Sequence, residues 1–173
     1  LPWNDLKLLQ ERLSVGDVAA VIMEPAMCNS GAIAPGAGFL DGSKEACEKN
    51  GSLLIFDETI TGFRLAPGGA QERFGVTPHL ATFAKAMANG FQVAAITGPA
   101  DLMELFVSGG VMHGGTYNSQ LLSMAATVAT LDAVSAPGFH ADLEVKSEKL
   151  REGLTKAFVD AGIPASVNSF PGF

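Results

Sequence analysis

Two adjacent carboxylates follow a short apolar run in the stretch LLIFDETITGFR, which covers residues 53 to 64. Four apolar residues of this kind predict a buried strand, and Asp57 and Glu58 come directly after them. Ligands of parallel α/β sheets gather at the carboxyl ends of the strands. An acid at a strand end either caps a turn or faces a ligand, so this strand end is a candidate site.

Lys85 occupies a similar position after another apolar segment, LATFA, and Ala86 follows it. A lysine inside an apolar segment is unusual, because its ammonium group loses solvation there. A desolvated ε-amine gives up its proton more easily and becomes a nucleophile toward carbonyl carbons. The sequence therefore predicts that Lys85 is partly desolvated and forms a Schiff base. The alternative is an ordinary solvated surface lysine.

A third candidate is the glycine-rich stretch HGGTYNSQ, residues 113 to 120. Glycines let the backbone approach a ligand, the hydroxyl of Thr116 suits a phosphate group, and a helix expected to begin near Asn118 adds its positive end. The alternative is a flexible turn. Residues 38 to 44 (GFLDGSK) do not fit GxxxxGK[ST], and no GxGxxG, GxSxG or HExxH occurs. These absences argue against P-loop, Rossmann and hydrolase sites.

The elements expected around these residues alternate between apolar strands and helices. Strands are expected at residues 18–23, 53–56, 80–84 and 92–97, and helices at 6–13, 43–50, 118–134 and 143–158. Ser43 is expected to cap the helix at 43–50. The alternation predicts an α/β fold with a parallel sheet covered on both faces. Ala136-Pro137-Gly138 breaks the helix at 118–134, and a second domain is expected to begin there.

Composition and charge favour a folded, soluble protein. The chain has 173 residues, of which 47% are hydrophobic, and its net charge of -7 argues against nucleic acid as a partner. The longest apolar run, residues 18 to 23, is far shorter than a membrane helix, so no membrane partner and a cytoplasmic location are expected. Cys28 and Cys47 are expected to be reduced thiols, with no metal site. Because the first residue is not Met and an apolar stretch begins at the end, the chain is expected to be part of a longer protein.

Four blocks of the sequence together resemble the class-III pyridoxal-phosphate aminotransferases. They are IMEPAMCNSGAIAPGAGFLDG, LLIFDETITGFR, GGAQERFGVTPHLATFAKAMANGF and HGGTYNSQ, in the family's order and within residues 1 to 134. The most similar branch contains glutamate-1-semialdehyde aminomutase and its transaminase relatives. The resemblance implies a fold-type I transferase. Residues 1–136 would be part of the cofactor-binding large domain, whose sheet is mainly parallel, and residues 137–173 the start of the C-terminal small domain.

The resemblance also implies a role for each candidate residue. Lys85 corresponds to the family's lysine that forms the Schiff base with pyridoxal 5'-phosphate and shuttles a proton between substrate and cofactor. Asp57 corresponds to the acid that keeps the ring nitrogen protonated. Thr116 corresponds to a residue that binds the cofactor phosphate across a homodimer interface. Thr59 stands where the family usually has a Val packed on the ring.

Some positions limit what the resemblance implies about the substrate. Glu24 and Glu58 match family acids and are expected to form structural hydrogen bonds. Ile60 replaces a Gln of many omega-transaminases, His79 stands where Asp is common, and HGGTYNSQ differs from the aminomutase version of that block. These departures favour a transaminase acting on an amino acid or amine, β-amino acids included, over the aminomutase or a related racemase. The expected partners are a small-molecule amino donor and an oxo acid or aldehyde acceptor.

Two other classes of function stay open. A domain that keeps the fold without catalysis would bind no cofactor, whereas an aldolase-type lysine enzyme would form a Schiff base with its substrate directly. The family's upstream Gly-Ser phosphate loop, ring-stacking aromatic residue and downstream substrate-binding domain match nothing in residues 1 to 173. We therefore expect the complete protein, rather than this chain alone, to be active.

Overall fold

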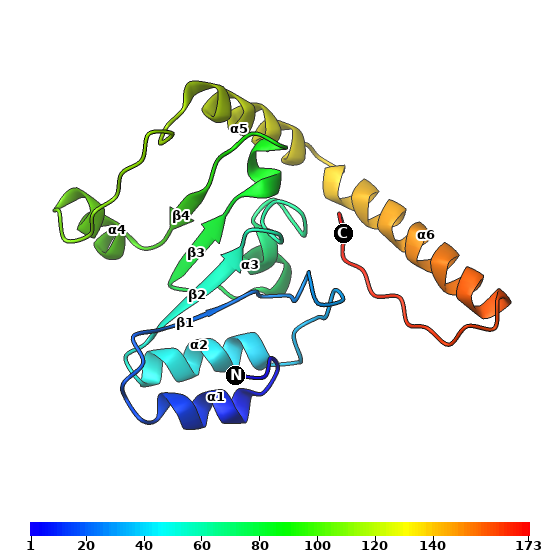
Figure 1. Ribbon diagram of the computed structural model, residues 1–173, viewed down its shortest axis with the longest axis horizontal. Coiled ribbons are helices and arrows are strands. Elements are labelled where there is room, and N and C mark those ends of the chain that lie inside the picture. The colour runs from blue at the N-terminus through cyan, green and yellow to red at the C-terminus, as the bar shows by residue number, and fades with distance from the viewer.

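The computed structural model describes residues 1–173 and contains one four-stranded sheet in the order β1-β2-β3-β4 (Figure 1). The strands are β1 (Ala20–Met23), β2 (Leu53–Glu58), β3 (Leu80–Phe83) and β4 (Ala95–Thr97). The helices are α1 (Leu6–Leu13), α2 (Phe39–Lys49), α3 (Gly69–Phe74), the 3-10 helix η1 (Lys85–Ala88), α4 (Ala100–Val107), α5 (Leu121–Val134) and α6 (Phe139–Asp160). The predicted α/β class is confirmed.

The first three strands are parallel, and β4 runs antiparallel to β3. The register of β2 and β3 places Asp57 directly beside Thr82. The expected mainly parallel sheet is confirmed, and β4 is its antiparallel strand. Residues 84–94 alone separate β3 from β4, and a parallel crossover needs roughly a dozen residues or more.

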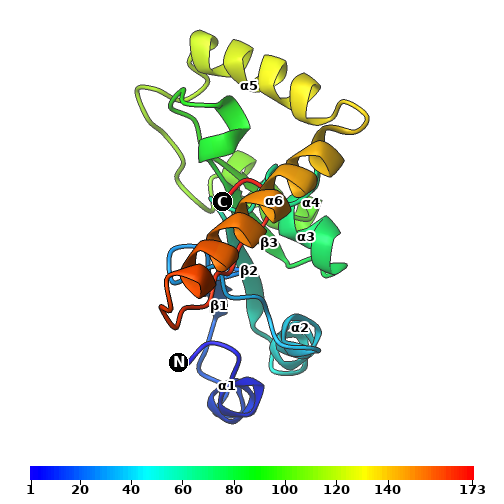
Figure 2. The same ribbon diagram turned by 90° about the vertical axis from the view of Figure 1, so that its right-hand side faces the viewer.

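Helices α1 and α2 cover one face of the sheet. The main apolar core joins side chains of both helices to alternate residues of β2, Leu54 and Phe56. The opposite face of β2, which carries Leu53, Ile55 and Asp57, is only half-buried. The prediction of a sheet covered on both faces is therefore wrong for β2, whose burial alternates along the strand. Figure 2 shows α1 and α2 at one end of the molecule and α5 at the other.

Helix α2 begins earlier than the sequence predicted. Its N-cap is Gly38, whose φ of 74° suits a glycine, so the expectation that Ser43 caps the helix is wrong. Ser43 is buried inside α2, and its hydroxyl donates to the carbonyl of Phe39 at 2.6 Å. Phe39 and Leu40 belong to the core, and burying them extends the helix by about one turn toward its N-terminus.

Helices α5 and α6 lead away from the sheet. α5 begins at Leu121 rather than near Asn118, and α6 is one continuous helix that includes the expected segment 143–158. Figure 1 shows α6 projecting from the body, with the C-terminal segment running back toward the sheet. No single helix is long and apolar enough to cross a membrane. Helices α5 and α6, which meet at a bend of 77°, reach a sufficient length and apolar composition only when they are taken together. The domain boundary expected at 136/137 falls in this bend and stays a prediction.

Candidate functional site

Asp57 and Glu58 lie inside β2 rather than after it, because the strand continues to Glu58. Successive side chains of a strand point to opposite faces of the sheet. Glu58 therefore points to the covered face, where it is fully buried, and Asp57 points to the half-open face. The two acids have different surroundings although they are neighbours in the chain.

Glu58 has hydrogen-bond donors at both of its carboxylate oxygens. Oε2 accepts from the Thr61 hydroxyl at 3.0 Å and from the Ala70 N–H at 2.6 Å. Oε1 accepts from the backbone N–H and the side-chain amide of Gln71 at 3.2 and 3.0 Å. Gly69 lies so close that an added Cβ would be 2.3 Å from Oε2. Glu58 therefore ties α3 to β2, which is the structural role expected for it.

Asp57, in contrast, uses only one carboxylate oxygen within the chain. Oδ1 accepts from the Thr59 N–H at 3.0 Å and from the Thr82 hydroxyl at 3.3 Å, and Oδ2 accepts no hydrogen bond. Burial acts to raise the pKa of Asp57, but hydrogen bonds from Thr59 and Thr82 and the charge of Lys85 outweigh it, so the pKa lies below its ordinary value. Asp57 is therefore an anion at neutral pH with one oxygen available to a cationic N–H donor.

Lys85 is the first residue of η1, the 3-10 helix that follows β3, and its backbone lies in the left-handed region with φ 43°. A lysine with positive φ is uncommon, and such strain concentrates at functional sites. Lys85 itself is exposed in this chain, whereas Met87 and Ala88 of the same turn are buried. The expectation of a desolvated Lys85 is therefore wrong for this chain. Met87 and Ala88 turn toward the core, whereas Lys85 faces solvent at the edge of the sheet.

A small hollow of about 80 Å³ joins these residues at the carboxyl ends of β1, β2 and β3. Its lining consists of Glu24, Asn29, Asp57, Thr59, Ile60 and Lys85. Lys85 also lines a larger hollow of about 850 Å³ that extends to α5 and to the start of α6. An anionic carboxylate with a free oxygen beside a primary amine suits a ligand that offers both a protonated ring nitrogen and a carbonyl carbon.

Glu24 holds the loop that forms one wall of the small hollow. Its Oε2 accepts from the Cys28 N–H at 3.3 Å, and its carbonyl accepts from the Trp3 indole at 3.2 Å. Burial, with a further contribution from the charge of Glu24, raises the pKa of the Cys28 thiol to about 12. The sequence analysis did not single out Asn29 in this loop; its place in the Gly-rich loop that follows a strand-end acid is the signal that was available.

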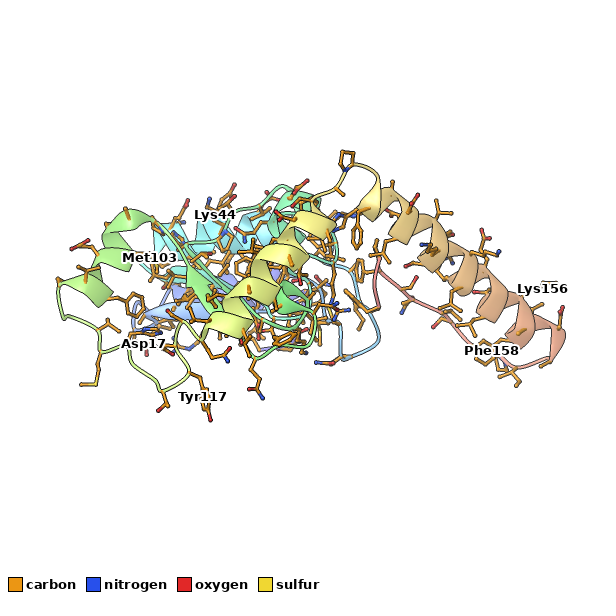
Figure 3. The ribbon with its side chains drawn as sticks, turned by 90° about the horizontal axis from the view of Figure 1, so that it is seen from above. Asp17, Lys44, Met103, Tyr117, Lys156 and Phe158 are labelled. Atoms are coloured by element: carbon orange, nitrogen blue, oxygen red, sulfur yellow. The ribbon has the colours of Figure 1, made fainter.

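Thr116 does not join the other predicted site residues. It lies in the exposed connection between α4 and α5 and lines neither hollow. Figure 3 shows the neighbouring Tyr117 pointing away from the sheet. The chain therefore brings together Asp57, Thr59 and Lys85, and it leaves Thr116 apart from them.

Known proteins share this architecture. The family described as "Aminotransferase class-III" matches residues 3–167. The chain is 43% identical over 171 residues to a glutamate-1-semialdehyde 2,1-aminomutase from Desulfatibacillum aliphaticivorans, a match that covers 97% of this chain and 40% of that protein. Among solved structures, a transaminase with PLP bound superposes with a TM-score of 0.91 at 26% identity, covering 99% of this chain and 41% of the other.

A second similar solved structure is that of an aminotransferase named for a β-amino acid. The β-phenylalanine aminotransferase from Variovorax paradoxus superposes with a TM-score of 0.89 at 31% identity, and the match covers 99% of this chain and 40% of that one. The chain thus spans about 40% of the length of these relatives. The resemblance found in the four sequence blocks is confirmed over nearly the whole chain, and we conclude that the chain belongs to the class-III aminotransferase family.

Proposed function

We propose that the protein containing this chain is a pyridoxal 5'-phosphate-dependent aminotransferase, which moves an amino group between an amino acid or amine and an oxo acid or aldehyde. The observation that carries this proposal is the free oxygen of the Asp57 carboxylate, which lines the same hollow as Lys85. Family membership and the solved transaminase with bound PLP support the cofactor.

The residues around the small hollow match what the cofactor needs. When bound, pyridoxal phosphate withdraws electrons from the carbon that carries the amino group. Lys85 offers the amine that holds the cofactor aldehyde and later moves the substrate proton. Asp57 offers the anionic oxygen that keeps a proton on the ring nitrogen, and Thr59 lies in the lining beside it.

Reductive labelling tests this assignment. The complete polypeptide is titrated with pyridoxal phosphate, reduced with borohydride and mapped by peptide mass spectrometry. We expect the pyridoxyl label on Lys85, and we expect it to vanish in Lys85→Ala while it persists in Lys49→Ala, a control on α2. A label spread over many lysines that is unchanged by Lys85→Ala would refute the proposal.

We also propose that Thr116 binds the cofactor phosphate of a partner protomer in a homodimer. Its position in an exposed connection away from Lys85 supports this arrangement. So do large apolar side chains that flank this connection and face solvent in the single chain, among them Met112 and Leu121, which are 98% and 84% exposed.

Mixed dimers test the dimer proposal. One chain carries Lys85→Ala and the other carries Thr116→Val. If Thr116 acts across the interface, one site of each mixed dimer has both native residues and binds cofactor with full affinity. If it acts within its own chain, every site carries one defect, and cofactor binding with native affinity disappears.

The 43% identical aminomutase gives a second candidate function. An aminomutase moves an amino group within one molecule, so its turnover needs no separate oxo acceptor. A transaminase stops after one half-reaction without that acceptor. Turnover of glutamate-1-semialdehyde with and without an oxo acid therefore separates the two functions. We further propose that the protein is cytoplasmic, that it acts on small molecules, and that its small domain begins at residue 137.

A further inference from the structure

We propose that Thr82 is a positioning residue that fixes the orientation of Asp57, so that the free carboxylate oxygen faces the ring nitrogen of the cofactor. This inference rests on the proposed function, because the cofactor gives Oδ2 its purpose. Strand β3 would then contribute a side chain of its own to the site, in addition to leading to Lys85.

The sheet register places the two residues together. Asp57 of β2 and Thr82 of β3 are direct neighbours across the parallel ladder. Directly paired residues of adjacent strands project from the same face of the sheet. The Thr82 hydroxyl donates to Oδ1 of Asp57 at 3.3 Å and has no other hydrogen-bond partner in the chain.

Two donors are needed to hold a carboxylate in one orientation. The terminal torsion of an aspartate is broad, so a single hydrogen bond leaves the group free to rotate about its Cβ–Cγ bond. The Thr59 N–H approaches Oδ1 at 3.0 Å from the turn after β2, and the Thr82 hydroxyl approaches the same atom from the neighbouring strand. With Oδ1 held from two directions, Oδ2 is the oxygen left for a ligand.

The hydroxyl, rather than the shape of the side chain, carries this role. Thr and Val are both β-branched and suit a strand equally, so strand formation alone does not require a hydroxyl at this position. The hydrogen bond from Thr82 also helps to keep the pKa of Asp57 below its ordinary value. Replacing Thr82 by Val keeps the volume and removes the donor.

The test compares four variants of the complete polypeptide. Thr82→Val and Thr82→Ala remove the hydroxyl, Thr82→Ser retains it, and Thr97→Val is the control on β4, away from the hollow. The first readout is the pKa of the Asp57 carboxyl, measured without cofactor by carbon-13 NMR. We expect it to rise in the two hydroxyl-free variants and to match the native value in Thr82→Ser and Thr97→Val.

The second readout is the affinity for pyridoxal phosphate, measured by titration of the visible spectrum. We expect about a tenfold loss in Thr82→Val and Thr82→Ala, the usual scale for one hydrogen bond to a charged group, and near-native affinity in Thr82→Ser. Unchanged carboxyl titration and unchanged affinity in the hydroxyl-free variants would overturn the inference. A loss that Thr82→Ser fails to restore would also overturn it, because the side-chain shape would then be responsible.

The outcome for Thr82 is separable from the outcome for the proposed function. If the native protein takes no label on Lys85, the proposed function fails and the inference fails with it. If Lys85 is labelled normally but Thr82→Val and Thr82→Ala titrate and bind the cofactor as the native protein does, the inference about Thr82 is wrong and the proposed function stands.

Discussion

The two faces of β2 carry the same chemical group in opposite circumstances. On the covered face, Glu58 is fully buried and both of its oxygens accept hydrogen bonds. On the half-open face, Asp57 keeps one oxygen without a donor. The difference shows that burial and satisfied hydrogen bonds mark a structural acid, whereas an incompletely satisfied anion at the edge of a hollow marks one available to a ligand.

The largest effect is expected from changing each acid to its amide. In Glu58→Gln, an NH₂ group replaces one of two oxygens that both accept from donors, so at least one buried donor loses its partner. We expect the free energy of unfolding to fall by about 3 kcal/mol. In Asp57→Asn, the amide oxygen can stay at Thr59 and Thr82 while the NH₂ group takes the free position, and we expect a loss below about 1 kcal/mol.

Urea unfolding of the two amide variants measures this difference directly. Equal losses of stability in Glu58→Gln and Asp57→Asn would remove the distinction between the two faces. A larger loss in Asp57→Asn would reverse it.

A smaller effect is expected from the glycine beside Glu58. Gly69 has φ 71°, and an added Cβ would lie 2.3 Å from Glu58 Oε2. Gly16 has φ 79° with nothing within 4 Å of an added Cβ, so Gly16→Ala is a matched control for the backbone strain. We expect Gly16→Ala to cost about 1 kcal/mol and Gly69→Ala about 2 kcal/mol in all, because Glu58 must move as well. Equal costs in thermal or urea unfolding would mean that Glu58 is not held in place.

Sequence patterns predicted the α/β class, the strands around Asp57 and Lys85, and the presence of both residues at one edge of the sheet. Because β1 to β3 are parallel, their carboxyl ends share one edge of the sheet, so recognising the strands from local patterns was enough to place Asp57 and Lys85 near each other. The strand continues for two residues to Glu58, however, and so places the two acids on opposite faces of the sheet, a separation that the sequence analysis did not predict. Periodicity alone leaves a strand end uncertain by that amount.

Other features depend on distant parts of the chain and escaped the sequence analysis. The contact of Thr82 with Asp57 needs the register between β2 and β3, which no local pattern states. The His79 ring accepts the Leu54 N–H at 2.8 Å, a long-range contact of the same kind. The exposure of Lys85 depends on how η1 turns, so apolar neighbours in sequence were a poor guide to its solvation.

A further prediction concerns how the open face responds to pH. The pKa of Asp57 is lowered in the folded chain, so its charged form stabilises the fold above the unfolded-state pKa, and that contribution is lost as the pH falls through the folded pKa. We expect the stability difference between the native chain and Asp57→Asn to be constant near neutral pH and to shrink below about pH 4. Unfolding curves at several pH values measure it. A difference that grows on acidification would show that the pKa is raised instead.

The smallest effect is expected at Cys28, in the loop that walls the small hollow. Burial and the charge of Glu24 raise the pKa of its thiol to about 12, so very little thiolate is present at pH 8. In a Cys47→Ser background, which leaves Cys28 as the one thiol among residues 1–173, we expect its alkylation by iodoacetamide to be far slower than that of an ordinary exposed cysteine. Adding Glu24→Gln removes the nearby negative charge and is expected to raise the rate modestly, because burial is the larger cause.

The alkylation rates also report on the half-open face itself. A rate for native Cys28 equal to that of a small thiol would mean that water reaches the loop freely, and the hollow beside Asp57 would then be as solvated as the surface. A slow rate that rises only slightly in Glu24→Gln would place Cys28 in a poorly hydrated wall. The two faces of β2 would then differ chiefly in the donors they offer to a carboxylate, with dehydration playing the lesser part.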